Sequence, residues 1–366
     1  MIRRILSFLP RWPVVDFYAS HWIDEIWVRT TIAACRRHGV RARLVLSGGK
    51  GAAPPDLAVR YAALGVPVVE TLSVEQLHKQ RMKHVVTASS GIPRSFFGPT
   101  LKRLVHMPHS LVSLHMIYPH GAFDGYDTLF AAGPQHAIEW EHMRALAGLP
   151  KGCVLPVGYG KMDLLSEAFA ATSPALQNRS VLIAPSWGET NLLRLMGPDL
   201  IRRLLDQDLT VVLRPHPSFF LKDEPELADT IVAAAGDPRF TLETSTHIEG
   251  TAMLTARVMV TDYSGAAFEF SALHNRPTVF VDLPKKVLNP YWEQVPSAPV
   301  EVALRRPLGT LAAPDIESVV GAIFGALDHP PAPQDIGAVV PQFLYARPSV
   351  GDFAASEILT MLEDVA

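Results

Sequence analysis

The sequence has little of what disulfide-rich, membrane-spanning or nucleic-acid-binding proteins require. Its only two cysteines, Cys35 and Cys153, are far apart and lack metal-ligand spacing, which argues against a disulfide framework and fits a reducing compartment. The longest apolar stretch, residues 319–327, has about half the roughly 18 residues of a membrane span. A formal net charge of -3 does not indicate nucleic acid as the main partner.

The N-terminal stretch contains paired arginines, Arg3 and Arg4, and a few apolar residues, but Pro10 and Pro13 interrupt it. It is short for a signal peptide and lacks a small-residue cleavage site. We therefore expect a first β-strand here, and contact with a membrane surface is the alternative. The expected location is the cytoplasm, with peripheral binding to the inner face of the cell membrane left open.

Strand-like and helix-like segments alternate along the 366 residues, of which 48% are apolar. This length favours two domains, and the alternation predicts parallel βαβ units and a doubly wound sheet in each. In the first half we predict strands at 40–46, 66–69, 85–88, 104–107, 127–131 and 153–157, with helices at 55–64, 74–80 and 135–146. In the second half we predict strands at 181–184, 210–213, 240–242, 258–260 and 278–281, with helices at 191–205, 225–235, 248–254, 316–327 and 352–362.

The predicted domain boundary lies at residues 171–179, a stretch rich in Ala, Ser, Pro and Asn. We predict Rossmann-like domains over residues 1–170 and 180–345, and a C-terminal helix in residues 346–366 that packs back on the first domain. Two doubly wound domains facing each other across a cleft form the GT-B arrangement of many glycosyltransferases, although paired Rossmann-like domains also occur in other families.

Residues 256–282 combine a short apolar run, a polar turn at 261–265, a helical pattern that carries Glu269, and a second apolar run. Backbone N–H groups at the start of such a helix, together with the helix dipole, favour a bound phosphate. An ordinary βαβ crossover has the same pattern. This stretch alone leaves both interpretations open.

Polar residues follow three predicted strands of the second half, at 185–187, 214–218 and 262–265. Because the carboxyl ends of parallel strands meet at one edge of a sheet, we expect these residues to line one crevice. Arg214 offers a guanidinium fork to phosphate oxygens, and His216 can donate to a phosphate or carry a proton. Their convergence favours a phosphate site over a plain crossover.

Taken in order, these motifs resemble those of the CDP-glycerol glycerophosphotransferase family, whose enzymes build teichoic-acid-like glycerol-phosphate polymers. The similarity rests on VLIAPSW (181–187), VVLRPHPS (211–218) and VMVTDYSGAAFEFSALHNRPTVFVD (258–282). The segment VGYGKMDLL (157–165) also resembles a family motif, although Gly160 stands where the family has proline. The resemblance covers about residues 104–283 and implies a GT-B fold.

The resemblance implies that the second domain, residues 180–345, binds a CDP-activated donor. His216 matches a histidine that contacts the pyrophosphate, and Glu269 matches an acidic position suited to ribose or base. Ser264 and Gly265 match a Ser-Ser pair at the helix N-terminus, so one hydroxyl is missing here. The predicted donor-binding residues are Ser186, Trp187, Arg214, Ser218, Asp262, Tyr263, Ser264, Gly265 and Glu269, and His216 is also a catalytic candidate.

The resemblance further implies that the first domain, residues 1–170, holds the acceptor and supplies a general base from a His-Gly dipeptide. Two histidines compete for this role. His120 is followed by Gly121, as in the family, whereas His109 is followed by Ser110. We favour His109 because it follows a predicted strand and because its spacing to the segment at 123–130 suits the family better.

The implied reaction transfers glycerol phosphate, or a similar polyol phosphate such as that of CDP-ribitol, to a hydroxyl group and releases CMP. The expected acceptor is a cell-envelope glycan, a lipid-linked oligosaccharide or a growing polymer. We predict neither a metal nor another cofactor. The alternatives are a GT-B glycosyltransferase or epimerase that uses a nucleotide-sugar, and an inactive module that binds nucleotide or glycan.

Overall fold

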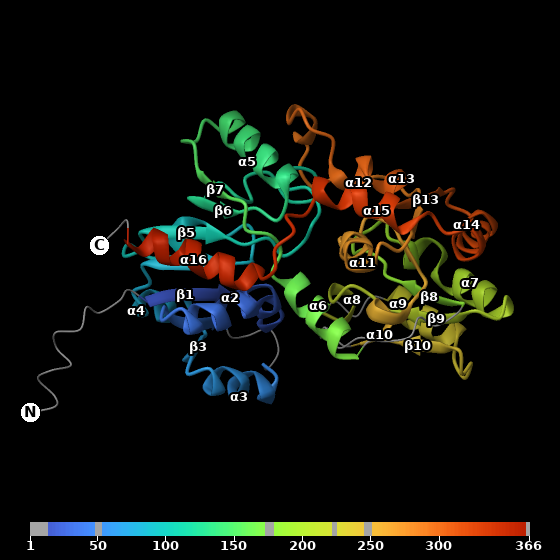
Figure 1. Ribbon diagram of the computed structural model, residues 1–366, viewed down its shortest axis with the longest axis horizontal. Coiled ribbons are helices and arrows are strands. Elements are labelled where there is room, and N and C mark those ends of the chain that lie inside the picture. The colour runs from blue at the N-terminus through green and yellow to red at the C-terminus, as the bar shows by residue number, and fades with distance from the viewer. Residues whose placement is uncertain (1–13, 48–52, 173–178, 222–224, 245–250, 364–366) are drawn as a thin grey trace, which may run out of the picture.

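The computed structural model describes residues 14–47, 53–172, 179–221, 225–244 and 251–363. Residues 1–13, most of the predicted linker at 171–179, and residues 248–250 of the predicted helix at 248–254 lie outside this range. The described chain forms two α/β lobes that lie side by side, each built around a parallel sheet (Figure 1).

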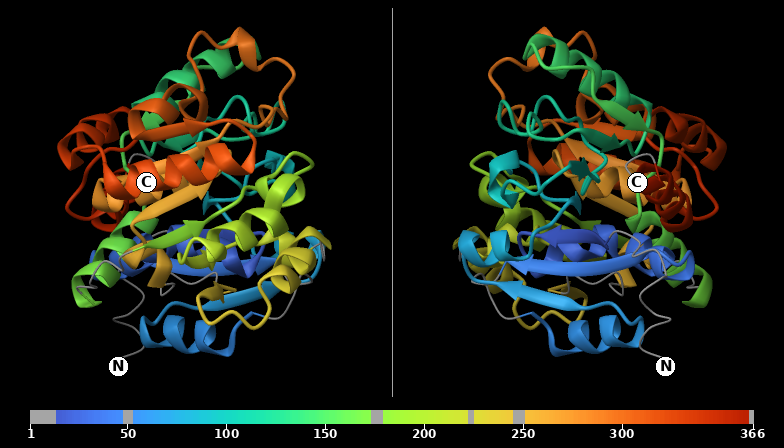
Figure 2. Two further views of the ribbon diagram at one scale, coloured as in Figure 1. Left: turned by 90° about the vertical axis from the view of Figure 1, so that its right-hand side faces the viewer. Right: turned by 90° about the vertical axis from the view of Figure 1, so that its left-hand side faces the viewer.

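The first sheet has seven parallel strands in the order β3-β2-β1-β4-β5-β6-β7. Its strands are short runs of mostly apolar residues, and helices lie on both sides of them (Figure 2). The strands are β1 (Val14–Ala19), β2 (Arg41–Ser47), β3 (Val68–Thr71), β4 (His84–Thr87), β5 (Arg103–His106), β6 (Thr128–Phe130) and β7 (Cys153–Leu155). The α-helices are α2 (Glu25–Arg37), α3 (Pro55–Ala63), α4 (Val74–Lys79), α5 (Pro134–Leu146) and α6 (Lys161–Thr172).

The second sheet has six parallel strands in the order β10-β9-β8-β11-β12-β13. The strands are β8 (Ser180–Ile183), β9 (Thr210–Leu213), β10 (Phe240–Leu242), β11 (Val258–Thr261), β12 (Thr278–Val281) and β13 (Gly309–Ala312). The α-helices are α7 (Leu192–Asp206), α8 (Ser218–Leu221), α9 (Pro225–Ala233), α10 (Thr251–Thr255), α11 (Ala266–His274), α12 (Val300–Ala303), α13 (Arg305–Leu308), α14 (Ile316–Asp328) and α15 (Pro333–Val339).

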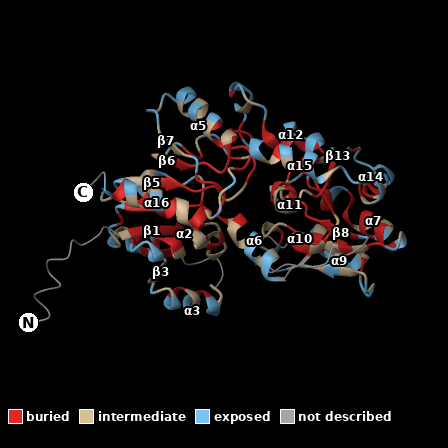
Figure 3. Ribbon diagram, viewed as in Figure 1, coloured by how far each residue is buried: buried red, intermediate tan, exposed pale blue. Residues whose placement is uncertain are grey.

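Both sheets reverse their strand order next to the first strand of the lobe, between β1 and β4 and between β8 and β11. Such a reversal opens a crevice at the carboxyl ends of the two strands, where open α/β sheets bind ligands. The strands on either side of each reversal are buried, and the exposed surface lies mainly on the surrounding helices (Figure 3). The predicted fold class, two doubly wound parallel sheets, is confirmed.

The C-terminal helix α16 (Val350–Glu363) lies against the first lobe, beside α2 (Figure 1). The backbone N–H groups of Val350 and Gly351 donate to the Asp163 carboxylate at 3.0 and 2.8 Å. A Cβ atom at Gly351 would lie 2.7 Å from the carbonyl oxygen of Thr30, so only glycine lets the helix approach α2 this closely. The chain therefore ends on the lobe in which it begins.

Residues 110–118, here called the bridging segment, also connect the lobes. They follow β5 and reach into the second lobe. Met116 is buried in the apolar core of that lobe, and its carbonyl accepts from the N–H groups of Leu288 and Asn289 at 2.9 and 3.2 Å. The buried Glu301 carboxylate accepts from the backbone N–H and the hydroxyl of Ser113 at 2.8 and 2.5 Å. These contacts fix the first-lobe residues next to the cleft relative to the second sheet.

Candidate functional site

A cleft of about 540 Å³ lies between the lobes, where the carboxyl ends of both sheets meet. Residues that follow β1, β4, β5 and β7 form one wall, and residues that follow β8, β9, β10, β11 and β12 form the other. Of the predicted site residues, those in its walls are His109, Ser186, Trp187, Arg214, His216, Ser218, Tyr263, Ser264, Gly265 and Glu269. Among the described residues that line this cleft, His120 and Asp262 do not occur.

His109 lies in the first-lobe wall with both ring nitrogens hydrogen-bonded. Nδ1 is 2.7 Å from the backbone oxygen of Ala88, and Nε2 is 3.2 Å from the Tyr118 hydroxyl. Because a carbonyl oxygen can only accept, Nδ1 carries the proton and Nε2 of the neutral ring holds a lone pair. The Tyr118 hydroxyl then donates to Nε2, and a substrate hydroxyl can make the same hydrogen bond in its place.

The surroundings of His109 keep its ring neutral. Burial lowers the pKa of His109, and the nearby Asp24 carboxylate and the hydrogen bond to Ala88 offset this only in part. The rings of Trp27 and Tyr118 pack at centroid distances of 5.4 and 5.5 Å. A neutral imidazole with a lone pair on the nitrogen that faces the substrate is the state that a general base requires.

His120, the competing candidate for the base, is exposed. Its ring packs on Tyr291 with the centroids 4.9 Å apart. The structure therefore places His120 on the surface and His109 in the cleft, although only His120 has the glycine that the family pattern contains.

His216, in the opposite wall, holds the other tautomer. The backbone N–H of Ser218 donates to His216 Nδ1 at 3.2 Å, and the Ser218 hydroxyl lies 2.9 Å from the same nitrogen. Because a backbone N–H can only donate, Nδ1 is the acceptor and Nε2 of the neutral ring carries the proton. His216 thus offers an N–H group, the partner that a phosphate oxygen needs. The Trp187 ring lies nearby, with a centroid distance of 6.1 Å.

Among the described residues, three lysine or arginine side chains line the cleft. Arg214 Nε lies 3.7 Å from Glu243 Oε2, and Lys286 Nζ lies 3.4 Å from the centroid of the Trp187 ring. Lys161, the first residue of α6, is the third. The sequence analysis did not predict either lysine as a site residue. Lys161 could have been found because it lies in the family-like segment at 157–165, and Lys286 because it follows the carboxyl end of β12.

Asp262 fixes the loops of the cleft instead of lining it. Its Oδ1 accepts from the backbone N–H groups of Ser186 and Tyr263, both at 2.7 Å, and Oδ2 accepts from Leu192 N at 3.0 Å. The side chain is buried. It therefore ties the loop after β8, the start of α7 and the turn after β11 together, and the geometry assigns it to positioning rather than to the expected contact with a donor.

The turn after β11 presents Ser264 to the cleft at the start of α11. Ser264 Oγ accepts from the backbone N–H of Ala266, the first residue of the helix, at 3.3 Å. Tyr263 is buried beside it, with its hydroxyl donating to the Leu283 carbonyl at 3.2 Å and Arg305 stacked over its ring. Tyr263 thus supports the turn from behind while Ser264 faces the open space.

Glu269 is assigned to ribose or base by the sequence resemblance, but its carboxylate contacts the first lobe. Oε2 lies 2.6 Å from Lys161 Nζ, and Oε1 accepts from the Tyr159 hydroxyl at 2.8 Å. Trp27 Nε1 donates to the same hydroxyl at 2.8 Å. Burial lowers the pKa of Lys161 and raises that of Tyr159. Glu269 therefore anchors a buried polar network that joins the lobes at the cleft.

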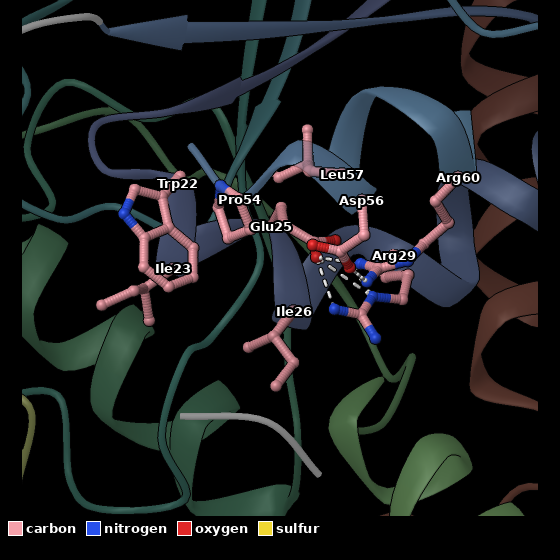
Figure 4. Close-up of a pocket in the computed structure, with 9 residues that line it drawn as sticks. All are labelled: Trp22, Ile23, Glu25, Ile26, Arg29, Pro54, Asp56, Leu57 and Arg60. Atoms are coloured by element: carbon pink, nitrogen blue, oxygen red, sulfur yellow. Dashed lines mark hydrogen bonds and ion pairs between the residues drawn. The ribbon is translucent and has the colours of Figure 1, made fainter. Parts of the chain in front are cut away.

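A much smaller pocket, about 10 Å³, lies between α2 and α3 (Figure 4). Its centre is the buried Glu25, whose carboxylate accepts from Arg29 at 2.5 Å, Arg60 at 2.8 Å and the Tyr61 hydroxyl at 2.8 Å. Because the carboxylate is paired and the space is too small for a nucleotide, this cluster is structural.

The described ranges contain no group of three or more His, Cys, Asp or Glu side chains arranged to hold a metal ion. In the same ranges, no helix is both long enough and apolar enough to span a membrane.

Residues 124–285 match the sequence profile of the CDP-Glycerol:Poly(glycerophosphate) glycerophosphotransferase family. The predicted family resemblance is confirmed. The glycerophosphotransferase match contains every predicted donor-side residue from Ser186 to Glu269, whereas His109 and His120 precede it. A comparison with curated proteins finds no match.

Solved structures with a similar fold align over nearly the whole chain at low identity. A UDP-GlcNAc 2-epimerase from Neisseria meningitidis, bound to UDP-GlcNAc, is 10% identical with a TM-score of 0.59, covering 97% of this chain and 100% of the other. The wall teichoic acid polymerase TagF is 13% identical with a TM-score of 0.59, covering 97% and 90%. A glycosyltransferase from Rickettsia africae is 11% identical with a TM-score of 0.53, covering 97% and 99%. At these identities the likeness establishes the fold, and the predicted GT-B arrangement is confirmed.

Proposed function

We propose that the protein is a transferase that moves glycerol phosphate, or a similar polyol phosphate, from a CDP-activated donor to an acceptor hydroxyl and releases CMP. The observation that carries this proposal is the pair of opposite histidine tautomers across one cleft. His109 offers a lone pair at Nε2, and His216 offers an N–H at Nε2 beside Arg214. One wall can therefore take a proton from a nucleophile while the other binds the phosphates it attacks.

In the proposed reaction, the acceptor oxygen attacks the donor phosphorus that carries the polyol. His109 Nε2 takes the hydroxyl proton as the new P–O bond forms. The P–O bond of the pyrophosphate breaks, and its electron pair leaves with CMP as a phosphate oxygen. Arg214 and the Nε2–H of His216 stabilise the charge that develops on this leaving group. The product is a phosphodiester between the acceptor and the polyol.

The start of α11 supplies the remaining contacts to the donor. The Ser264 hydroxyl faces the cleft, and the backbone N–H groups at a helix N-terminus attract an anion. Trp187 lies next to His216 and offers an aromatic face on which a nucleotide base can stack. The acceptor, a glycan, a lipid-linked oligosaccharide or a polymer, enters from the side of His109.

Similarity in fold to UDP-GlcNAc 2-epimerases supports a second candidate, an enzyme that uses a nucleotide-sugar in the same cleft. A thermal-shift panel of CDP-glycerol, CDP-ribitol, UDP-GlcNAc and CMP separates the candidates, because a ligand at 100 times its Kd stabilises the folded state by about 2.7 kcal/mol. We expect stabilisation by the cytidine compounds. Stabilisation by UDP-GlcNAc alone would instead favour the epimerase.

A turnover assay completes the test. The protein is incubated with the stabilising CDP compound and a cell-envelope fraction, CMP is quantified, and the product is examined by mass spectrometry. We expect CMP release that depends on the acceptor, together with a product heavier by one polyol phosphate. Stabilisation by CDP-glycerol without any CMP release would identify an inactive binding module and overturn the proposed reaction.

A further inference from the structure

Gly265, the residue that immediately precedes α11, has no space for a side chain. A Cβ atom at this position would lie 2.2 Å from Ser110 Oγ and 3.5 Å from the Val112 Cγ1 atom. The backbone φ of Gly265 is −61°, which any residue can adopt, so the conformation does not require glycine. A hydroxyl from the other lobe occupies the place that a side chain at this position would take, so a larger residue here requires the Ser110 hydroxyl to move.

That hydroxyl belongs to the first residue of the bridging segment. Ser110 follows His109 directly and lines the same cleft as Ser264 and Gly265. Its Oγ accepts a long hydrogen bond of 3.4 Å from the Val112 N–H, and accepting this bond leaves the Ser110 O–H as a donor. The start of α11 therefore has a hydroxyl on each side of the domain interface, from Ser264 and from Ser110.

We propose that Ser110 replaces the hydroxyl that Gly265 lacks and completes the phosphate-binding turn from the first lobe. The inference rests on the proposed function, because it assigns Ser110 to the donor phosphate of that reaction. The family motif that this turn resembles has a second serine where this chain has Gly265, and Ser110 brings a hydroxyl to that place from the other lobe.

The position of Ser110 links donor binding to both lobes. A donor phosphate bound to both hydroxyls contacts both lobes, and it contacts the residue next to His109. Donor binding therefore adds a contact to the bridging segment directly beside the general base before the acceptor arrives. A turn with both hydroxyls in the second lobe would bind the same phosphate without this link to the base.

The test is a reciprocal exchange with three variants, Ser110→Gly, Gly265→Ser and the double variant. We expect Ser110→Gly to raise the KM for the CDP donor roughly ten-fold, the usual effect of losing one hydrogen bond to a charged group. We expect Gly265→Ser alone to lose more activity, because its Cβ collides with the Ser110 hydroxyl. The double variant, which removes the collision and restores a second hydroxyl, should recover most of the donor affinity.

Ser110→Ala separates the hydroxyl from the packing, because it keeps the Cβ atom and removes only the donor. The inference is overturned if Ser110→Ala keeps the wild-type KM, or if the double variant is no better than Gly265→Ser. Thermal unfolding of the wild type and the three exchange variants measures the cost of the collision to stability without any ligand. The double variant should regain the stability that Gly265→Ser loses. Absence of CMP release by the wild-type protein would instead contradict the proposed function, so the two failures are distinguishable.

Discussion

Lys161 Nζ and Glu269 Oε2 lie 2.6 Å apart and form an ion pair between the two lobes. Their side chains are only 12% and 6% exposed, so each charge depends on the other. The Tyr159 hydroxyl, 2.8 Å from the second Glu269 oxygen, also lies 3.0 Å from the carbonyl oxygen of His109. The pair is thus part of the structure that holds His109 in the cleft.

We expect Glu269→Gln to lower the free energy of unfolding by about 3 kcal/mol, because it leaves the Lys161 ammonium buried without its counter-charge. Urea unfolding followed by circular dichroism measures this loss. A matched control replaces both partners with apolar residues, Lys161→Met and Glu269→Leu together, and should recover most of the stability. A Glu269→Gln variant with the wild-type unfolding midpoint would contradict the structural role.

His109→Ala should reduce kcat by about 10²- to 10⁴-fold, the range that loss of a general base produces. His120→Ala is the matched control, because His120 is exposed and packs only on the Tyr291 ring among the described contacts that involve it. Its activity should stay within about two-fold of wild type, as is usual for surface substitutions. Both variants are assayed for CMP release at saturating donor. Loss of activity in His120→Ala alone would make His120 the base.

The acid limb of the pH profile should lie at lower pH than for an ordinary histidine. Burial lowers the pKa of His109 below its reference value of 6.5, so the neutral base persists at pH values at which a free imidazole is already protonated. We expect kcat/KM, which reports ionisations of the free enzyme, to fall only below pH 6.5. A limb with its midpoint above pH 6.5 would show that another group controls activity.

Much of the fold was predictable, because buried parallel strands appear in a sequence as short apolar runs. The bounds predicted at 210–213, 240–242 and 278–281 are those of β9, β10 and β12. Helix α2 was missed because Val28, Thr31 and Ile32 are β-branched and lower its helix propensity, and packing against α16 stabilises it instead. β13, a four-residue strand at the edge of its sheet, was also missed.

The candidate site was predictable as a set of strand ends but not as a set of contacts. The carboxyl ends of parallel strands lie at one edge of a sheet, and this rule correctly predicts that Ser186, His216 and Ser264 line the same cleft. It does not reveal partners from the other lobe, such as Lys161 for Glu269, which is 108 residues distant in sequence. Nor does it distinguish Asp262, which binds backbone N–H groups, from a residue that faces the ligand.

Asp262 and Ser264 should therefore respond differently to substitution, although they are two residues apart in one motif. Asp262→Asn replaces one carboxylate oxygen with an NH₂ group that cannot accept, so at least one buried backbone N–H loses its partner. We expect a loss of about 2 kcal/mol in the free energy of unfolding.

Ser264→Ala is the matched control at the adjacent surface of the turn. It removes the acceptor of one hydrogen bond from the Ala266 N–H and should cost no more than about 1 kcal/mol of stability, while raising the donor KM roughly ten-fold. Urea unfolding and donor titration of both variants give the comparison. If Asp262→Asn instead keeps its stability and raises only the donor KM, its carboxylate contacts the donor, and the assignment drawn from its three backbone hydrogen bonds is wrong.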